Sequence, residues 1–228
     1  MTAPLPDNEA ERLEALRQYR VLDTASEQPF DDAARLAAQV CGTPIALVSL
    51  IDADRQWFKA RFGLDASETP REVAFCAHTI LSARPLVVED ATRDRRFADN
   101  PFVTGGPQVR FYAGAPLLDA AGHGLGTVCV VDRQPRRPSP EQVAALTAIA
   151  RQVVALLECR RTADRLAAAL EKVKALSGLL PVCAWCRDVR NDAGYWQRVD
   201  VYLKENAGVD TTHGICPGCA GKLGLPGA

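Results

Sequence analysis

Residues 44–52 read PIALVSLID, and this short stretch decides which fold the chain can adopt. All positions from Ile45 to Ile51 except Ser49 are apolar, so the segment has no polar face. A strand of this kind has to be covered on both sides, as in the middle of a sheet. Residues 55–64, RQWFKARFGL, follow after a short turn and predict its hairpin partner. In this second strand two sets of side chains alternate: Trp57, Lys59 and Arg61 with Phe58, Ala60 and Phe62.

The segments on either side of this hairpin predict an α+β fold. Helices are expected over residues 7–19 and from Pro29 to Gly42, a short helix over 75–83, a short strand over 85–90, and a long Ala-rich helix from Ser139 to about Leu176. The sequences VRFYAGAPLLD and LGTVCVVD (109–119 and 125–132) predict a second hairpin. Because strands follow one another in hairpins without alternating helices, about five antiparallel strands flanked by helices are expected.

Composition excludes several classes of protein. The 228 residues contain 27 Lys and Arg against 28 Asp and Glu, for a net charge of −1, so nucleic acid is not an expected partner. Hydrophobic residues make up 47% of the chain, which excludes disorder throughout. The N-terminus lacks a secretory signal, and the most apolar helical stretch, Val143–Leu157, contains Arg151 and is too short to cross a bilayer. A cytoplasmic protein without a membrane partner is therefore expected.

Six blocks of sequence, in this order, resemble the GAF domain family. They are RLEALRQYRVLDT, IALVSLIDADRQWFKARFGL, FCAHTI, PLVVEDATRDRRFADNP, VRFYAGAPL and GTVCVVD, and together they cover roughly residues 8–158. They are similar to the bacterial subgroup that is often joined to sensor kinases and cyclic-dinucleotide enzymes. The resemblance implies an antiparallel sheet of five or six strands. Helices from the two ends of the domain would cover one face of the sheet, and a small-molecule pocket would lie on the other.

The resemblance leaves the ligand of this pocket open. The Asn-Lys-Phe-Asp-Glu constellation of GAF domains that bind cyclic nucleotides is absent, and the Cys-His pair of bilin-binding members is replaced by Cys76-Ala77-His78. GAF-type sulfoxide reductases use several cysteines, and only Cys76 is a plausible pocket thiol here, with no obvious resolving partner; Cys41 and Cys129 fit apolar periodicity and are expected in the core. The candidate ligand-binding residues are Trp57, Phe75, Cys76, His78, Phe111 and Tyr112.

The second half of the long helix carries an apolar seam. Its residues recur at alternating spacings of three and four: Leu156, Cys159, Ala163, Leu166, Leu170 and Val173. This spacing is typical of a coiled coil and predicts a parallel homodimer. The alternative is one amphipathic helix that packs on its own domain.

Four of the eight cysteines form two CxxC pairs near the C-terminus, Cys183 with Cys186 and Cys216 with Cys219. Two such pairs, separated by 29 residues, have the spacing of a structural four-cysteine Zn²⁺ site, and a rubredoxin-like iron site remains an alternative. His213 could replace one cysteine or support the ligands from outside. A small core is expected around the metal from Trp185, Tyr195, Trp196, Val199, Tyr202, Leu203 and Ile215. The segment 176–223 also resembles a module at the C-terminus of bacterial PAS, GAF and receiver-type proteins, which implies a signalling context.

Together these patterns predict four segments: a lead-in with its helix (1–29), a GAF core (30–140), a connector helix (141–176) and a zinc-binding module (177–228). We expect a signal-sensing protein that is not an enzyme, in which a GAF pocket senses a small molecule or redox state. The dimeric helix would transmit the signal, and the zinc module would contact an unidentified signalling protein. The alternatives are a switch in which zinc thiolates are oxidised and a GAF-type sulfoxide reductase acting through Cys76.

Overall fold

A computed structural model of the chain describes residues 2–177, 181–191, 193–212 and 214–223; for residues 171–177, 207, 218 and 221 it describes the backbone only. The chain divides into two compact units, residues 1–165 and 166–228.

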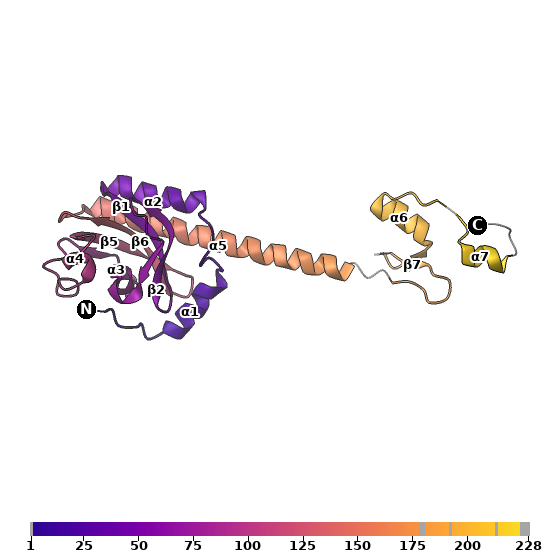
Figure 1. Ribbon diagram of the computed structural model, residues 1–228, viewed down its shortest axis with the longest axis horizontal. Helices are drawn as coiled ribbons and strands as arrows, with labels where there is room; N and C mark the ends of the chain where they lie inside the picture. Colours follow the sequence, from indigo (N-terminus) through magenta and orange to yellow (C-terminus); the bar gives the residue numbers. More distant parts are fainter. Residues whose placement is uncertain (1, 178–180, 192, 213, 224–228) are drawn as a thin grey trace. The chain divides into compact units, whose positions relative to one another are not determined.

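The first unit is built on one six-stranded antiparallel sheet (Figure 1). Its strand order is β3-β2-β1-β6-β5-β4. The strands are β1 (Ile45–Ile51), β2 (Arg55–Phe62), β3 (Glu68–Pro70), β4 (Leu86–Val88), β5 (Phe111–Leu118) and β6 (Gly124–Asp132). Both predicted hairpins are confirmed, and β1 lies in the middle of the sheet between β2 and β6. All seven residues of β1 are buried, as its apolar sequence requires.

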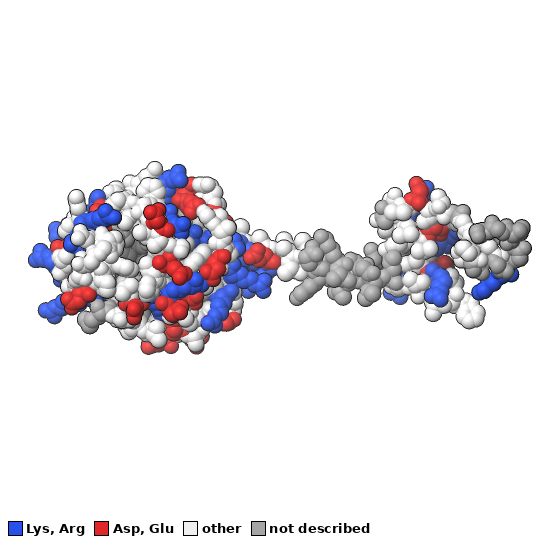
Figure 2. All heavy atoms as spheres, viewed as in Figure 1, with Lys and Arg blue, Asp and Glu red and all other residues white. Residues whose placement is uncertain are grey.

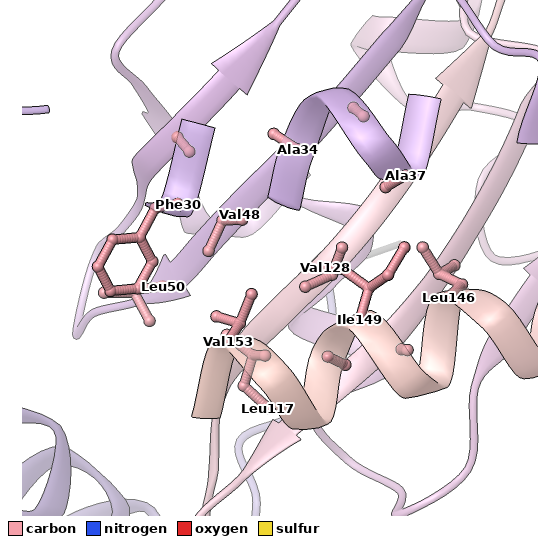
Figure 3. Packing of buried hydrophobic residues seen from close by; sticks show 14 of the residues in the cluster. Phe30, Ala34, Ala37, Val48, Leu50, Leu117, Val128, Leu146, Ile149 and Val153 are labelled. Atoms are coloured by element: carbon pink, nitrogen blue, oxygen red, sulfur yellow. The ribbon is translucent and has the colours of Figure 1, made fainter. Parts of the chain in front are cut away.

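Long helices cover one face of this sheet. They are α1 (Glu9–Gln18), α2 (Gln28–Cys41) and the first half of α5 (Pro140–Ser177). Helix α2 ends at Gly42, whose φ of 63° is the left-handed conformation that glycine adopts readily. Figure 3 shows how α2 and α5 lay small and branched side chains on the sheet, for example Ala34 and Ala37 from α2 and Ile149 and Val153 from α5. The helix-covered face predicted from the resemblance is confirmed.

Short elements cover the opposite face. They are η1 (Arg71–Val73), α3 (Phe75–Thr79) and α4 (Pro101–Thr104), joined by irregular chain. A second apolar cluster lies beneath them, in which the rings of Phe75 and Phe97 stack with centroids 4.0 Å apart and Phe75 lies 5.3 Å from the ring of Tyr112. The two clusters share the sheet as a common wall.

A β-bulge breaks the alternation expected in β2. Val48 pairs with Ala60 and Ser49 pairs with Phe58, so Lys59 is an extra residue without a partner in β1. Ala60 therefore packs on the helix-covered face, whereas simple alternation places it on the same face as Phe58. The buried ammonium of Lys59 is held by the Thr24 hydroxyl (2.9 Å), the Ala25 carbonyl (2.8 Å) and the Glu27 carboxylate (2.6 Å).

Helix α5 has the length that the sequence predicts, and its first half packs against the sheet. It runs for 38 residues, and its part Pro140–Leu170 is long and apolar enough to cross a membrane by length and composition alone. The apolar part of this helix thus extends beyond Val143–Leu157, the stretch that was considered too short to cross a bilayer. Within the fold, apolar residues of α5 pack against the sheet: Leu146, Val153 and Leu157 are at most 1% exposed.

The second unit contains short elements: β7 (Val189–Arg190), β8 (Trp196–Gln197), α6 (Val199–Ala207) and α7 (Pro217–Lys222). Of its described hydrophobic residues, Val189 and Ala220 are buried, whereas Trp185 is 95% exposed and Tyr195 72%. The expectation of a small aromatic core was therefore wrong for these side chains. Apolar burial among the described residues does little to stabilise this unit.

An ionic cluster fastens α1 to the rest of the first unit. The guanidinium of Arg12, which is fully buried, donates to the Ile51 carbonyl at 2.6 Å and to the Glu9 carboxylate at 2.8 Å. Arg71 donates to the same carboxylate at 2.6 Å and to the Asp52 carbonyl at 2.9 Å. Partial burial raises the pKa of Glu9, but hydrogen bonds from Arg12 and Arg71 outweigh it and lower the pKa to about 2.

This cluster predicts a specific loss of stability in acid and on substitution. Because the folded pKa of Glu9 lies below its ordinary value of 4.5, its contribution is complete above pH 4.5 and is lost as the pH falls toward about 2. Glu9→Gln should lower the free energy of unfolding at neutral pH by about 2 kcal/mol, because it leaves two buried guanidinium groups short of an anion. Urea unfolding measured across this pH range checks both statements.

Glu14→Gln is the matched control for this experiment. Glu14 lies on the same helix, is 65% exposed and is 3.9 Å from Arg17, so its removal should change stability by less than about 0.5 kcal/mol. Equal losses in the two variants, or a Glu9→Gln difference that persists near pH 2, would contradict the assignment.

Candidate functional site

An apolar cavity lies between the sheet and the short elements on its second face. Its volume is about 230 Å³. The walls come from β1, β2, β3, β5, β6, α3, α4 and neighbouring loops: Ile45, Leu47, Gln56, Phe58, Leu64, Ala66, Thr69, Ala74, Phe75, Cys76, Phe102, Pro107, Val109, Tyr112, Cys129 and Val131. None of these lining residues is charged as Lys, Arg, Asp or Glu. A cavity of 150 Å³ with such walls already admits benzene, so this one has room for a small organic molecule.

Two polar atoms in the cavity wall have no hydrogen-bond partner among the residues that the structure describes. They are Oε1 of Gln56 on β2 and Oγ1 of Thr69 on β3, and both are buried. The two residues pair directly across the antiparallel strands, so their side chains lie side by side on the same face of the sheet. An unsatisfied buried polar group costs about 1–3 kcal/mol, which a ligand with a complementary polar group would recover.

The wall formed by α3, β5 and β6 carries a cluster of hydroxyl and thiol groups around Cys76. Its sulfur lies 3.5 Å from the sulfur of Cys129, and it accepts hydrogen bonds from the hydroxyls of Thr127 (3.0 Å) and Tyr112 (3.4 Å). Ser49 and Thr79 complete the cluster, with hydroxyls 2.9 Å from that of Thr127 and 2.6 Å from that of Tyr112. Unlike the pair on β2 and β3, these groups satisfy one another.

The cluster distinguishes the two thiols chemically. Burial raises the pKa of Cys76, but hydrogen bonds from Cys129, Ser49, Thr127 and Tyr112 together outweigh burial and lower the pKa to about 7. The hydrogen bond to Cys76, together with burial, raises the pKa of Cys129 well above its ordinary value. Cys76 is therefore the more acidic of the two thiols.

Gly114 allows Tyr112 to reach this cluster. The two residues lie two positions apart on the same face of β5, and a Cβ at position 114 would come within 2.1 Å of the Tyr112 hydroxyl oxygen. Only the missing side chain leaves room for the phenol ring to lie along the strand. The glycine of GAPL in the β5 sequence thus positions a hydrogen-bond donor for Cys76.

The six candidate ligand-binding residues fall in different places. Phe75, Cys76 and Tyr112 line the cavity. Trp57 and Phe111 belong to the cluster under the long helices, on the other face of the sheet. His78 packs its ring against Phe97 with centroids 4.8 Å apart and is not among the lining residues.

Among the lining residues that sequence reasoning missed, three carry a polar group or a thiol: Gln56, Thr69 and Cys129. Gln56 and Thr69 stand in strands as isolated polar residues, and nothing in their spacing shows that they face a cavity. Cys129 was assigned to the core by its apolar periodicity, and it is indeed buried, yet it lies beside Cys76. Its position opposite Gly114 in the second hairpin, with Cys76 on the helix above, follows only from the tertiary fold.

The two C-terminal CxxC pairs each lie in a short backbone turn. The chain around Cys183 and Cys186 closes into a tight loop, in which the Cys183 amide donates to the Asp188 carbonyl (2.7 Å) and the Arg187 amide to the Cys183 carbonyl (3.0 Å). Backbone amides of Cys186 and Trp185 also donate to the sulfur of Cys183 and lower its pKa. Such donors suit a thiolate that binds a metal ion.

The second pair lies at the start of α7, where the Cys219 amide donates to the Cys216 carbonyl at 3.0 Å. Among the described residues no three metal-ligating side chains lie close enough to hold one ion. His213, the alternative ligand, lies outside the described residues. Each cysteine pair supplies thiols of the kind that bind zinc. The four-cysteine site stays a prediction.

Charged side chains do not gather into a patch on the visible face of the first unit. Figure 2 shows acidic and basic groups interspersed there, as expected from 27 basic and 28 acidic residues in the chain.

Comparison with protein families identifies the first unit. The model of the GAF domain family matches residues 26–157, more than half of the chain. Two solved GAF domains have the same fold at low sequence identity. That of a phosphoenolpyruvate-protein phosphotransferase from Acinetobacter has a TM-score of 0.51 and 16% identity, over 68% of this chain and 96% of its own. The blue-light absorbing form of the PixJ GAF domain from Thermosynechococcus elongatus has a TM-score of 0.51 and 11% identity, over 74% of this chain and 98% of its own.

One curated relative is similar in sequence over most of this chain. A cyclic di-GMP phosphodiesterase of Pseudomonas aeruginosa is 44% identical over 164 residues, which are 72% of this chain. The chain covers 28% of the length of that relative. This finding overturns the expectation that the protein is not an enzyme, because the relative that matches 72% of this chain is named as a phosphodiesterase.

Proposed function

The chain belongs to the GAF domain family, and from this premise we propose that its cavity binds a small neutral molecule and thereby regulates cyclic di-GMP turnover. The observation that carries the proposal is an apolar cavity of about 230 Å³ with two unpartnered polar atoms on one wall. A ligand with an apolar body and one hydrogen-bond donor would satisfy Gln56 Oε1 and fill the space.

The cavity is chemically unsuited to the dinucleotide itself. Cyclic di-GMP carries two phosphate charges and two guanine bases, whereas the lining contains no Lys or Arg. Anions of this kind are held by basic side chains or by amides at helix starts. The cavity therefore serves a regulator of the phosphodiesterase system rather than its substrate.

The sheet offers a route from the cavity to the long helix. Ile45 and Leu47 of β1 line the cavity, while their neighbours Ala46 and Val48 pack under the helices on the other face. A ligand that favours one position of β1 would thus alter the packing beneath α5. Regulation requires that the ligand bind two arrangements with different affinity.

We further propose that two expected features complete this regulatory device. A second copy of the chain would pair along the helix seam, for which the support is the exposure of Leu166 (60%) and Leu170 (52%); the side chain of Val173 lies outside the described residues. A structural zinc ion held by the paired cysteines would stabilise the second unit, whose described residues bury little apolar surface. That unit would then contact the signalling partner.

The ligand proposal predicts that indole binds more tightly than indene. The two molecules have nearly the same shape, but only indole has an N–H that can donate to Gln56 Oε1. Calorimetric titration should give a dissociation constant about tenfold lower for indole, the value of one buried hydrogen bond. In Gln56→Leu this preference should disappear or reverse.

Gln39→Leu is the matched control, since Gln39 is exposed on α2 outside the cavity and its loss should leave both affinities unchanged. Thermal unfolding of both variants shows that the fold is retained. Equal affinities of the native chain for the two compounds, or no binding of either, would refute the proposed ligand chemistry.

The dimer proposal predicts a mass of twice 24.6 kDa for the native chain in light scattering. Leu166→Glu should give a monomer, because two carboxylates at one seam position repel each other in a parallel pair. Ala168→Glu, two positions away and off the seam, should stay dimeric. A native monomer at micromolar concentration would dismiss the idea.

The zinc proposal predicts one Zn²⁺ per chain in native mass spectrometry of protein purified without added metal. Cys186→Ser and Cys219→Ser should each lose the ion, because the site then lacks a thiolate ligand. Cys159→Ser, which removes an exposed cysteine of α5, should retain it. Metal-free native protein, or zinc retained in both ligand variants, would disprove the site.

A further inference from the structure

We propose that Cys76 and Cys129 form an oxidisable dithiol in the cavity wall, which a hydroperoxide closes to a disulfide. This inference concerns a chemical modification of the first unit and does not depend on the ligand proposed above. It rests on three observations of the described residues: the proximity of the two sulfurs, the donors that surround one of them, and the space beside both.

The two sulfurs are placed for bond formation. They lie 3.5 Å apart and come from different elements, Cys76 from α3 and Cys129 from β6, so a disulfide would fasten the short helix to the sheet. Both residues are buried, at 1% and 0% exposure, which shields them from large thiols in solution. Both also line the cavity, so one side of each is in contact with a space that a peroxide molecule can occupy.

The donors around Cys76 distinguish an attacking sulfur from a resolving one. Hydroxyls of Thr127 and Tyr112 point at its sulfur from 3.0 and 3.4 Å, and such donors stabilise a thiolate. Cys129 is approached by the Thr127 hydroxyl and the Leu47 amide, but its contact with Cys76 outweighs both and raises its pKa. A core cysteine that only fills space packs as a small hydrophobic residue without hydroxyl donors around its sulfur. A nucleophilic cysteine is helped by such donors because they stabilise its thiolate.

The reaction balances in two steps with hydrogen peroxide as the oxidant. The Cys76 thiolate attacks one peroxide oxygen, the O–O bond breaks, and the leaving hydroxide takes up the proton that the thiol had lost and becomes water; Cys76 is then a sulfenic acid. The Cys129 sulfur attacks Cys76 Sγ, the S–O bond breaks, and the hydroxyl leaves with the Cys129 proton as a second water. Two thiols lose two electrons and the peroxide gains them.

The cavity supplies the room that the second step needs. The sulfurs must approach by more than 1 Å to reach bonding distance, about 2.05 Å in disulfides. Because empty space adjoins both side chains, each sulfur has room to move on the cavity side. Closure would also remove the thiolate from the wall and thereby change the polarity of the cavity.

The test is peptide mapping of the reduced full-length chain after brief exposure to hydrogen peroxide, followed by acid quenching and alkylation of the free thiols. The expected product is one cross-linked peptide pair that joins Cys76 to Cys129. In Thr127→Val the cross-link should form about tenfold more slowly, because one hydrogen bond to the thiolate is lost. Linked peptides are identified by mass, so the other cysteines do not obscure the result.

Two cysteine variants define the order of events. In Cys129→Ser the reaction should stop at a Cys76 sulfenic acid, which dimedone traps. Cys41→Ser is the matched control, since Cys41 is a buried thiol in the cluster on the other face of the sheet, and the cross-link should form at the native rate. If native protein yields no Cys76–Cys129 peptide while its exposed cysteines are oxidised, the proposal is overturned; a sulfenic acid that forms on Cys129 first would overturn the assigned roles.

Discussion

The structure depends on one constraint: β1 is apolar on both faces, so both faces of the sheet must be covered by other parts of the chain. The chain satisfies this demand in two different ways. On one side the long helices α2 and α5 place small residues such as Ala34, Ala37 and Ala150 against the sheet, which lets helix and sheet approach closely. On the other side the cover consists of α3, α4 and irregular chain, which are too short to fill the space evenly. The cavity is the consequence of this second, looser covering.

The polar groups of the cavity fall into two kinds, and the difference gives each wall its chemistry. Around Cys76 every hydroxyl has a partner, so the cost of burial is already met within the protein. Gln56 and Thr69 have an atom each without one, so that wall gains stability only when something else supplies the hydrogen bond. A molecule that enters the cavity is thus oriented by one wall and brought beside a reactive sulfur at the other.

The sequence predicted those features that local pattern determines, and it failed where two segments meet in space. The apolar run of residues 45–51, the left-handed cap at Gly42 and the turn between 118 and 124 all specify local structure, and the elements there were predicted correctly. The bulge at Lys59 was missed because the alternation in 55–62 is regular as written and is interrupted only by the partner strand. Cys129 was missed as a partner of Cys76 for a similar reason, since 53 residues separate them and only the fold brings them together. Aromatic character alone also misplaced Trp57 and Phe111, because alternation along a strand shows which residues share a face but not which face borders the cavity.

The same alternation makes the sheet a link between its two faces. Along β6, Cys129 faces the cavity while Val128 and Val130 pack in the cluster under α2 and α5. Neighbouring residues of a strand share one backbone, so a bond that pulls Cys129 toward α3 displaces the residues that support the long helix. Because interiors are packed closely, a shift of this kind is transmitted rather than absorbed on the helix-covered face, whereas the cavity side can adapt. Under the proposed oxidation, the loosely covered face would receive the chemical change, and the tightly covered face would transmit it to the packing beneath α5.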